Sequence, residues 1–183
     1  WDNKGFIDDN KAIKGKIEGG YPILGGTDYL LEEKKEIWVV CAVGSAKIRK
    51  SIIEKTQINS NIRYATVIDP SVILSHRVEI GEGTIICAGT ILTVDITIGK
   101  HVIINLDCTL GHDDIIEDFV TIYPSVNISG NVLVETCAEL GTGMQVIQGK
   151  RIGRESILGA GAVVVKDIPE QCTAVGSPAR KIK

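Results

Sequence analysis

Aliphatic residues recur at every sixth position through most of the chain. From Ile62 to Val164, eighteen successive positions six residues apart all carry Ile, Leu or Val. The fourth residue after each of these anchors is usually small or β-branched, and the residue directly after an anchor is often Gly. A period of six matches neither an α-helix, which repeats about every 3.6 residues, nor a simple strand, which alternates about every 2. It favours short strands joined by tight corners.

Three such strands would make one coil of eighteen residues, so the eighteen hexads would make about six coils. Residues eighteen apart would then stack at about 4.8 Å, the spacing of neighbouring strands. Over residues 62–168 this pattern resembles the left-handed parallel β-helix of hexapeptide-repeat proteins. The resemblance implies a mainly β prism with three walls and a continuous aliphatic core.

Two charged residues interrupt the inward pattern. Asp114 and Lys150 occupy the fourth position after an anchor, where most other hexads carry aliphatic or small residues. Because an unpaired charge in an apolar core costs several kcal/mol, we expect the strand to be distorted at both residues and the charge to be turned outward.

The first sixty residues follow a different pattern, in which strand and helix alternate. The predicted elements are strands over 4–9 and 21–24, a helix from Thr27 to about Glu36, a buried parallel strand over 37–43 and a helix over 45–55. This order is typical of part of a doubly wound nucleotide-binding domain. We therefore expect a small, truncated α/β Rossmann-like domain over 1–58 and a β-helix domain with a C-terminal cap over 59–183.

The α/β pattern is incomplete at its start. A doubly wound domain normally opens with a strand and a glycine-rich phosphate loop, but no G-x-G-x-x-G precedes the first strand here, and the sequence opens at Trp1. We expect that a segment of about thirty residues, one β-α unit, precedes this sequence in the whole protein.

Composition narrows the classes of function. With 20 basic and 23 acidic residues the net charge is −3, which argues against a nucleic-acid binder. No stretch approaches about 18 apolar residues, and no signal peptide is visible, so no membrane partner is expected. Five cysteines without a C-x-x-C pair favour free thiols in a reducing cytoplasm.

The candidate chemistry lies at one corner of the predicted coil. Of the three histidines, His76 and His101 are interpreted as solvated turn residues, whereas His112 lies between Gly111 and Asp113. A carboxylate beside an imidazole fixes its tautomer and raises its basicity, as a general base requires. One coil further on, His112 stacks on Gly130, whose missing side chain would leave room for a ligand or serve only the turn.

A second corner carries small residues. Pro124, Thr142 and Ala160 stack there. Glycines at 141 and 143 flank Thr142, and glycines at 159 and 161 flank Ala160. Such an edge would suit a long, thin ligand such as coenzyme A, although turn formation alone also explains the glycines.

Four segments point to a family. They are Gly-Phe-Ile-Asp-Asp at 5–9, Ala-Val-Gly at 42–44, Gly-His-Asp at 111–113 and the ending over 159–180. Together they resemble the sialic-acid O-acetyltransferase group of hexapeptide-repeat sugar acetyltransferases, which includes bacterial nucleotide-amino-sugar N-acetyltransferases.

The resemblance implies an acetyl-CoA-dependent acetyltransferase that acts on an amine or hydroxyl of a sugar or nucleotide sugar. His112 would take the proton of the acceptor, Asp113 would support it, and acetyl-CoA would lie between the subunits of a homotrimer. The residues expected to bind acetyl-CoA are Thr121, where some members have a second histidine, Gly130, Thr142 and Ala160. Those expected to bind the nucleotide sugar are Asp8, Asp9 and Gly44.

Two other functions remain open. A metalloenzyme of the β-helix carbonic anhydrase type would use three histidines on zinc, but His76 and His112 are two coils apart, about 9–10 Å, and His101 has another hexad position. No metal is therefore expected. A non-catalytic scaffold subunit would keep the fold and the ligand edge without turnover.

Overall fold

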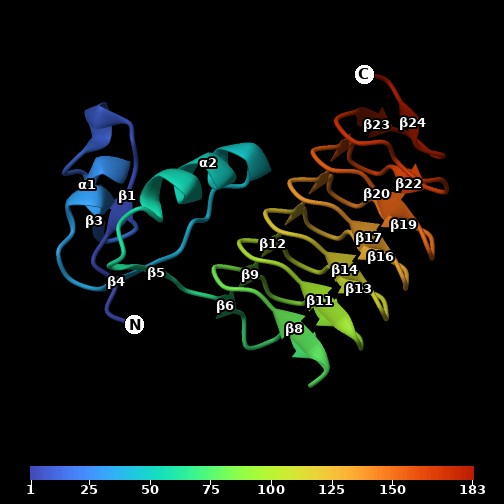
Figure 1. Ribbon diagram of the computed structural model, residues 1–183, viewed down its shortest axis with the longest axis horizontal. Coiled ribbons are helices and arrows are strands. Elements are labelled where there is room, and N and C mark those ends of the chain that lie inside the picture. The colour runs from blue at the N-terminus through green and yellow to red at the C-terminus, as the bar shows by residue number, and fades with distance from the viewer. The chain divides into compact units, whose positions relative to one another are not determined.

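The computed structural model describes all 183 residues and divides them into two compact units. One unit comprises Trp1–Val39 and Ser51–Arg63, and the other comprises Val40–Lys50 and Tyr64–Lys183. In Figure 1 the first unit holds the short strands and α1, and the second holds the stack of coils coloured green to red. The boundary between domains predicted at residues 58 and 59 stays a prediction.

The first unit contains a three-stranded sheet in the order β1-β3-β2. Its strands, with one short 3-10 helix between the first two, are β1 (Phe6–Ile7), η1 (Lys11–Ile13), β2 (Ile17–Glu18) and β3 (Tyr21–Gly25). β1 runs parallel to β3, and β2 forms an antiparallel hairpin with β3. The hairpin turn has positive φ at both Gly19 and Gly20, a conformation that glycine adopts without strain.

The first helix is shorter than predicted. α1 (Thr27–Glu32) ends before Glu36, because a distant side chain replaces its next turn. Asn59 Nδ2 donates to Leu30 O at 2.8 Å and to Glu33 O at 2.9 Å. These bonds satisfy carbonyls that a continuing helix would have bonded to its own N–H groups.

The predicted buried strand over 37–43 is wrong in length and burial. Only β4 (Ile37–Val39) forms, it pairs with β5 (Ile62–Tyr64) in a two-stranded sheet, and Trp38 is 50% exposed. The side chains of this short strand stay partly exposed, so the apolar run does not become a core strand.

The second helix, α2 (Ala46–Thr56), matches the helix predicted over 45–55. Its first N–H group, on Ala46, donates to Glu139 Oε1 at 2.9 Å, so a carboxylate caps the positive end of the helix. Neither helix has the length and apolar run that crossing a membrane requires.

Three parallel sheets form the walls of the second unit and confirm the predicted left-handed β-helix (Figure 1). The six-stranded sheet contains β7 (Ile73–Leu74), β10 (Ile91–Leu92), β13 (Thr109–Leu110), β16 (Asn127–Ile128), β19 (Gln145–Val146) and β22 (Val163–Val164). The five-stranded sheet contains β8 (Val78–Ile80), β11 (Ile96–Ile98), β14 (Ile115–Ile116), β17 (Leu133–Val134) and β20 (Arg151–Ile152).

The third wall is an eight-stranded sheet that ends in an antiparallel cap. Its strands are β6 (Val67–Ile68), β9 (Ile85–Ile86), β12 (Ile103–Ile104), β15 (Thr121–Ile122), β18 (Glu139–Leu140), β21 (Ile157–Leu158), β23 (Thr173–Val175) and β24 (Arg180–Lys181). From β6 to β22, partners along a wall lie eighteen residues apart, as where Thr109 pairs with both Ile91 and Asn127. The register therefore equals the predicted length of a coil.

The anchors form the core of this unit. Every anchor from Ile86 to Val164 is at most 3% exposed, whereas Ile68 and Leu74 in the open first coil are 37% and 40% exposed. Each fully buried Ile, Leu or Val contributes about 1.5–3 kcal/mol relative to exposure. The hexad pattern thus builds a rigid column that fixes where the corner residues lie.

Candidate functional site

His112 lies at the corner between β13 and β14, and backbone geometry determines which residues surround it. Asp113 has φ +61, and Asp95 and Asn131, one coil to either side, both have φ +57. Asp and Asn tolerate this left-handed region better than most side chains do. The repeating corner therefore favours a short polar residue directly after the histidine.

The imidazole and the carboxylate form an exposed pair. His112 Nδ1 lies 2.7 Å from Asp113 Oδ2, and the two side chains are 53% and 59% exposed. When the carboxylate accepts a hydrogen bond from Nδ1–H, Nε2 of the neutral imidazole keeps a free lone pair. The pair can then accept a proton from a bound molecule at Nε2.

Gly130 leaves the space in which the imidazole lies. A Cβ at Gly130 would come within 2.5 Å of His112 Nε2 and 2.7 Å of its Cε1. The next residue, Asn131, donates its backbone N–H to His112 O at 2.7 Å. The predicted stacking is therefore present, and the missing side chain makes room for the histidine itself. A contact between Gly130 and acetyl-CoA stays a prediction.

Asp114 points into the core, so the expectation that its charge turns outward is wrong. Its side chain is completely buried, and Oδ1 accepts the backbone N–H of Val132 at 2.9 Å. Burial raises the pKa of this carboxyl to about 7. Burying a protonated carboxyl that forms a hydrogen bond costs far less free energy than burying an unpaired carboxylate. The coil can therefore continue without distortion.

The prediction that His101 is a solvated turn residue is also wrong. His101 is 5% exposed, stacks on Phe119 at 5.2 Å between ring centroids and meets the edge of Tyr64 at 4.8 Å. No group of three or more His, Cys, Asp or Glu side chains is placed to hold a metal ion.

Thr121 and Gly44 contact each other. Thr121 is completely buried, and its hydroxyl donates to Gly44 O at 2.7 Å while accepting from Arg49 Nη2 at 2.9 Å. The hydroxyl proton of Thr121 is therefore committed to a backbone carbonyl. The predicted roles of Thr121 with acetyl-CoA and of Gly44 with nucleotide sugar stay predictions.

Arg49 is the residue that the sequence reasoning missed. It is 1% exposed, and burial lowers its pKa. Its guanidinium donates to Thr121 Oγ1 and to the carbonyls of Val43, Gly44, His101, Phe119 and Val120. Nothing in the sequence indicated its burial strongly, because a basic residue in an amphipathic helix is normally expected on the solvent-exposed face.

The small-residue corner joins β18 to β19 and β21 to β22. Thr142 and Ala160 are both exposed there. Gly143 N donates to Pro124 O at 2.9 Å, and Gly161 N donates to Thr142 O at 2.8 Å. These bonds place successive coils in one row, as the stacking argument predicted. This edge of the prism is a different one from the edge that carries His112.

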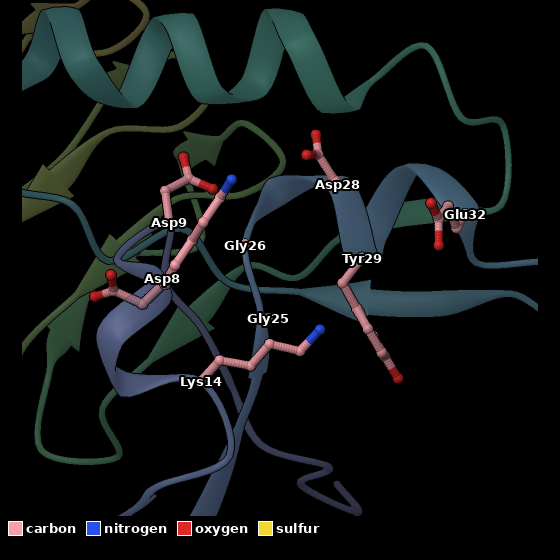
Figure 2. Close-up of a pocket in the computed structure, with 9 residues that line it drawn as sticks. Asp8, Asp9, Lys14, Gly25, Gly26, Asp28, Tyr29 and Glu32 are labelled. Carbon is pink, nitrogen blue, oxygen red and sulfur yellow. The ribbon is translucent and has the colours of Figure 1, made fainter.

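In the first unit, Asp8 and Asp9 line a hollow of about 350 Å³. Figure 2 shows them on one side of Gly25 and Gly26, with Tyr29 of α1 on the other. The remaining lining residues are Lys11, Lys14, Asp28 and Glu32.

Asp9 caps the first helix from inside this hollow. Its Oδ1 accepts from Thr27 N at 2.6 Å, and this backbone hydrogen bond lowers the pKa of Asp9. A Cβ at Gly26 would come within 2.5 Å of the same oxygen, so the glycine admits the carboxylate. Gly44 does not line the hollow.

Comparison with known proteins identifies the family. Residues 1–56 match the PglD N-terminal domain family. GDP-perosamine N-acetyltransferase from Escherichia coli is 30% identical over 184 residues, which cover 97% of this chain and 81% of that protein. The chain belongs to the hexapeptide-repeat sugar acetyltransferases. The family recognised from the four sequence segments is thereby confirmed.

Solved structures of this family share the whole fold. WeeI from Acinetobacter baumannii has a TM-score of 0.90 at 33% identity, covering 97% of this chain and 85% of that one. A histidine-to-asparagine mutant of perosamine N-acetyltransferase from Caulobacter crescentus, in complex with CoA and GDP-perosamine, has a TM-score of 0.85 at 32% identity, covering 90% and 79%. The acetyltransferase domain of PglB from Neisseria gonorrhoeae, in complex with acetyl coenzyme A, has a TM-score of 0.88 at 30% identity, covering 97% and 85%.

Proposed function

We propose that this member of the family transfers the acetyl group of acetyl-CoA to a nucleotide sugar, with His112 as general base and Asp113 as its support. The observation that carries the proposal is the His112–Asp113 pair, 2.7 Å apart, which lies against Gly130 at an exposed corner of the β-helix. Relatives that bind CoA together with GDP-perosamine, or acetyl coenzyme A, support both substrates.

In the proposed mechanism the protein contributes a base with a fixed tautomer. Asp113 holds the Nδ1 proton of His112, so Nε2 accepts the proton of the acceptor as the acceptor's nitrogen or oxygen attacks the thioester carbonyl. When the carbon–sulfur bond breaks, His112 returns that proton to the departing sulfur, and CoA leaves as the thiol. Backbone N–H groups would stabilise the oxyanion formed on the way.

An amine is the proposed acceptor. The curated relative and the Caulobacter crescentus protein are both named N-acetyltransferases. An amine also needs less basic assistance than a hydroxyl, which suits a pair as exposed as His112 and Asp113.

The acetyl-CoA site is proposed to lie between subunits of a homotrimer. Thr142 and Ala160 lie on one edge of the prism and His112 on another. A thioester that runs along the small-residue edge of one subunit would therefore meet the His112 of a neighbour. Gly130 would border the acetyl group of acetyl-CoA. Thr121 would act indirectly, because its hydrogen bond to Gly44 O holds its strand in place.

The nucleotide sugar is proposed to bind at Asp8 and Asp9 in the first unit, while the role predicted for Gly44 is kept as a separate prediction. The carboxylates of Asp8 and Asp9 are acceptors, so they suit the hydroxyl and ring N–H donors of a nucleoside better than its phosphates. Lys11 and Lys14, which line the same hollow, supply the positive charge that phosphates require.

The test is turnover with matched acceptors. The purified protein is mixed with acetyl-CoA and a panel of GDP- and UDP-linked amino sugars, each paired with its hydroxyl counterpart, and the CoA thiol is measured. We expect thiol release with one amino sugar and a product heavier by one acetyl group. A scaffold subunit would be stabilised against heat by acetyl-CoA without releasing thiol, and a protein inert to the whole panel would contradict the proposal.

A further inference from the structure

One inward hydroxyl of this β-helix bridges two backbone groups of the next coil, and a second makes half of the same bridge. Thr84 Oγ1 accepts from Val102 N at 3.1 Å, eighteen residues on, and donates to Gly99 O at 2.9 Å, fifteen residues on. Thr90 Oγ1 likewise donates to Asn105 O at 3.0 Å, also fifteen residues on. A hydroxyl can make such a bridge because it both accepts and donates.

Asp114 has the same hexad position and makes one half of the bridge. Its Oδ1 accepts from Val132 N, eighteen residues on, at 2.9 Å. The carbonyl fifteen residues on belongs to Ser129. Asp114 Oδ2 is buried and has no hydrogen-bond partner. An ionised carboxylate can only accept, whereas a neutral carboxyl can donate its O–H to that carbonyl and complete the bridge.

The surroundings of this carboxyl favour its neutral form. Its side chain is completely buried, and burial raises its pKa to about 7, against the smaller lowering by the backbone N–H groups of Val132 and Gly111. The titratable and charged groups nearest in the stack are His112 and Asp113 on its own turn, Asp95, paired with Arg77, on the preceding coil, and Lys150 two coils further on. None of them forms a hydrogen bond or an ion pair with the buried oxygens that would hold the anion.

We infer that Asp114 is a positioning residue for His112, and that its protonated carboxyl clamps the histidine turn to the Ser129-Gly130 peptide. Gly130 is the residue against which the imidazole lies, and Asn131 N already holds His112 O at 2.7 Å. A bond to Ser129 O fixes the peptide that precedes Gly130, and so fixes the seat of the imidazole. The consequence for catalysis rests on the proposed function.

Three variants separate positioning from simple core stability. D114N keeps an acceptor for Val132 N and a donor for Ser129 O, so it imitates the neutral acid. D114V removes both halves of the bridge. T90V is the matched control, because Thr90 is equally buried at the same hexad position on a different corner.

The kinetic outcome is expected in kcat. D114V should lower kcat by about tenfold or more and leave the KM for acetyl-CoA within about twofold, while D114N stays within about threefold of wild type. T90V should lower thermal stability without changing kcat. Wild-type kcat in D114V, or equal losses in D114N and D114V, would overturn the inference.

Two readouts without turnover keep the inference separate from the proposed function. Infrared spectra near neutral pH should contain the carbonyl stretch of a protonated carboxyl group, and D114N should remove it. In protein labelled with ¹⁵N-histidine, the ring signals of His112 should shift in D114V and stay in place in T90V. If the carbonyl band is absent, or if the His112 signals are unchanged in D114V, the clamp does not exist, whatever the substrate panel shows.

Discussion

The geometry of His112 depends on three neighbouring residues. Asp113 holds Nδ1, Gly130 leaves room for the ring, and Asn131 holds the carbonyl. Asp113 is adjacent in the chain and Gly130 is eighteen residues away, so both relations follow from the hexad register. Because the three contacts act on different parts of one residue, each can be tested by itself.

Replacing Gly130 by Ala should move the imidazole. The added Cβ would lie 2.5 Å from Nε2, closer than atoms approach without a shift, so the ring must turn away. Since a displacement of about 1 Å can cost about 100-fold in rate, we expect kcat to fall by about tenfold to 100-fold with acetyl-CoA affinity kept. Steady-state kinetics and calorimetric binding measure the two quantities.

The matched control for this change is Gly149→Ala. Gly149 follows Asn131 at the same corner, has φ +69 and faces open space. Alanine there should cost about 1 kcal/mol of stability through backbone strain while leaving kcat unchanged. Equal kcat in both variants would show that Gly130 serves only the turn.

The raised pKa of Asp114 predicts a pH dependence of stability. The folded carboxyl has a pKa of about 7 against an ordinary value of 3.8, so between these values the folded chain keeps a proton that the unfolded chain releases. Stability from this group is thus complete at low pH and declines as pH rises, by at most about 1.4 kcal/mol per pH unit.

Asn at position 114 does not titrate, so D114N should remove that share of the decline. Urea unfolding of wild type and D114N at several values of pH measures the difference between them. The difference in unfolding free energy should change between about pH 4 and 7 and be constant above. A difference that is the same at every pH would show that the carboxyl ionises normally.

At the scale of elements, the β-helix was predictable because its determinants are local and repeated. Each hexad contributes its own inward anchor, and every strand from β9 to β22 carries one. The first unit was less predictable, because α1 ends where Asn59 reaches its last carbonyls, and nothing near Glu32 reports that contact. The apolar run after Ile37 misled for a similar reason, since β4 found a single partner strand.

The hydrogen bonds of Arg49 join α2 to other elements, and removing them should cost considerable stability. R49M would remove the guanidinium from six acceptors in the second unit, of which Gly44 O and Val120 O keep another donor, so we expect a loss of about 3–5 kcal/mol in unfolding free energy. R49K restores the charge but not the planar fork and should recover only part. Denaturant unfolding of wild type, R49M and R49K measures the three free energies of unfolding.

An exposed arginine provides the comparison. Arg77 pairs with Asp95 at 2.9 Å, with side chains 56% and 43% exposed. Exposed pairs contribute about 0–1 kcal/mol, so R77M should stay close to wild type. Similar losses in R49M and R77M would contradict the role assigned to the buried guanidinium.

At the scale of the whole molecule, the sequence predicted which corner carries the His112–Asp113 pair and which carries the small residues. It did not predict that Asp114 is buried beneath that pair, because a single acid in an apolar pattern reads as a misplaced charge until its bond to Val132 is seen. Nor did it predict that Arg49 binds Thr121 and Gly44, which are far apart in the chain. Both omissions concern buried polar groups, whose hydrogen-bond partners cannot be read from the hexad pattern.

The proposed role of His112, to take the proton of the acceptor, is tested by comparing three proteins. Acetyl transfer to the responding nucleotide sugar is measured with wild type, H112N and the exposed-histidine control H76N. We expect H112N to lose at least about 100-fold in kcat while acetyl-CoA affinity and melting temperature stay at wild-type values, and H76N to be unaffected. Wild-type turnover by a correctly folded H112N would contradict this role.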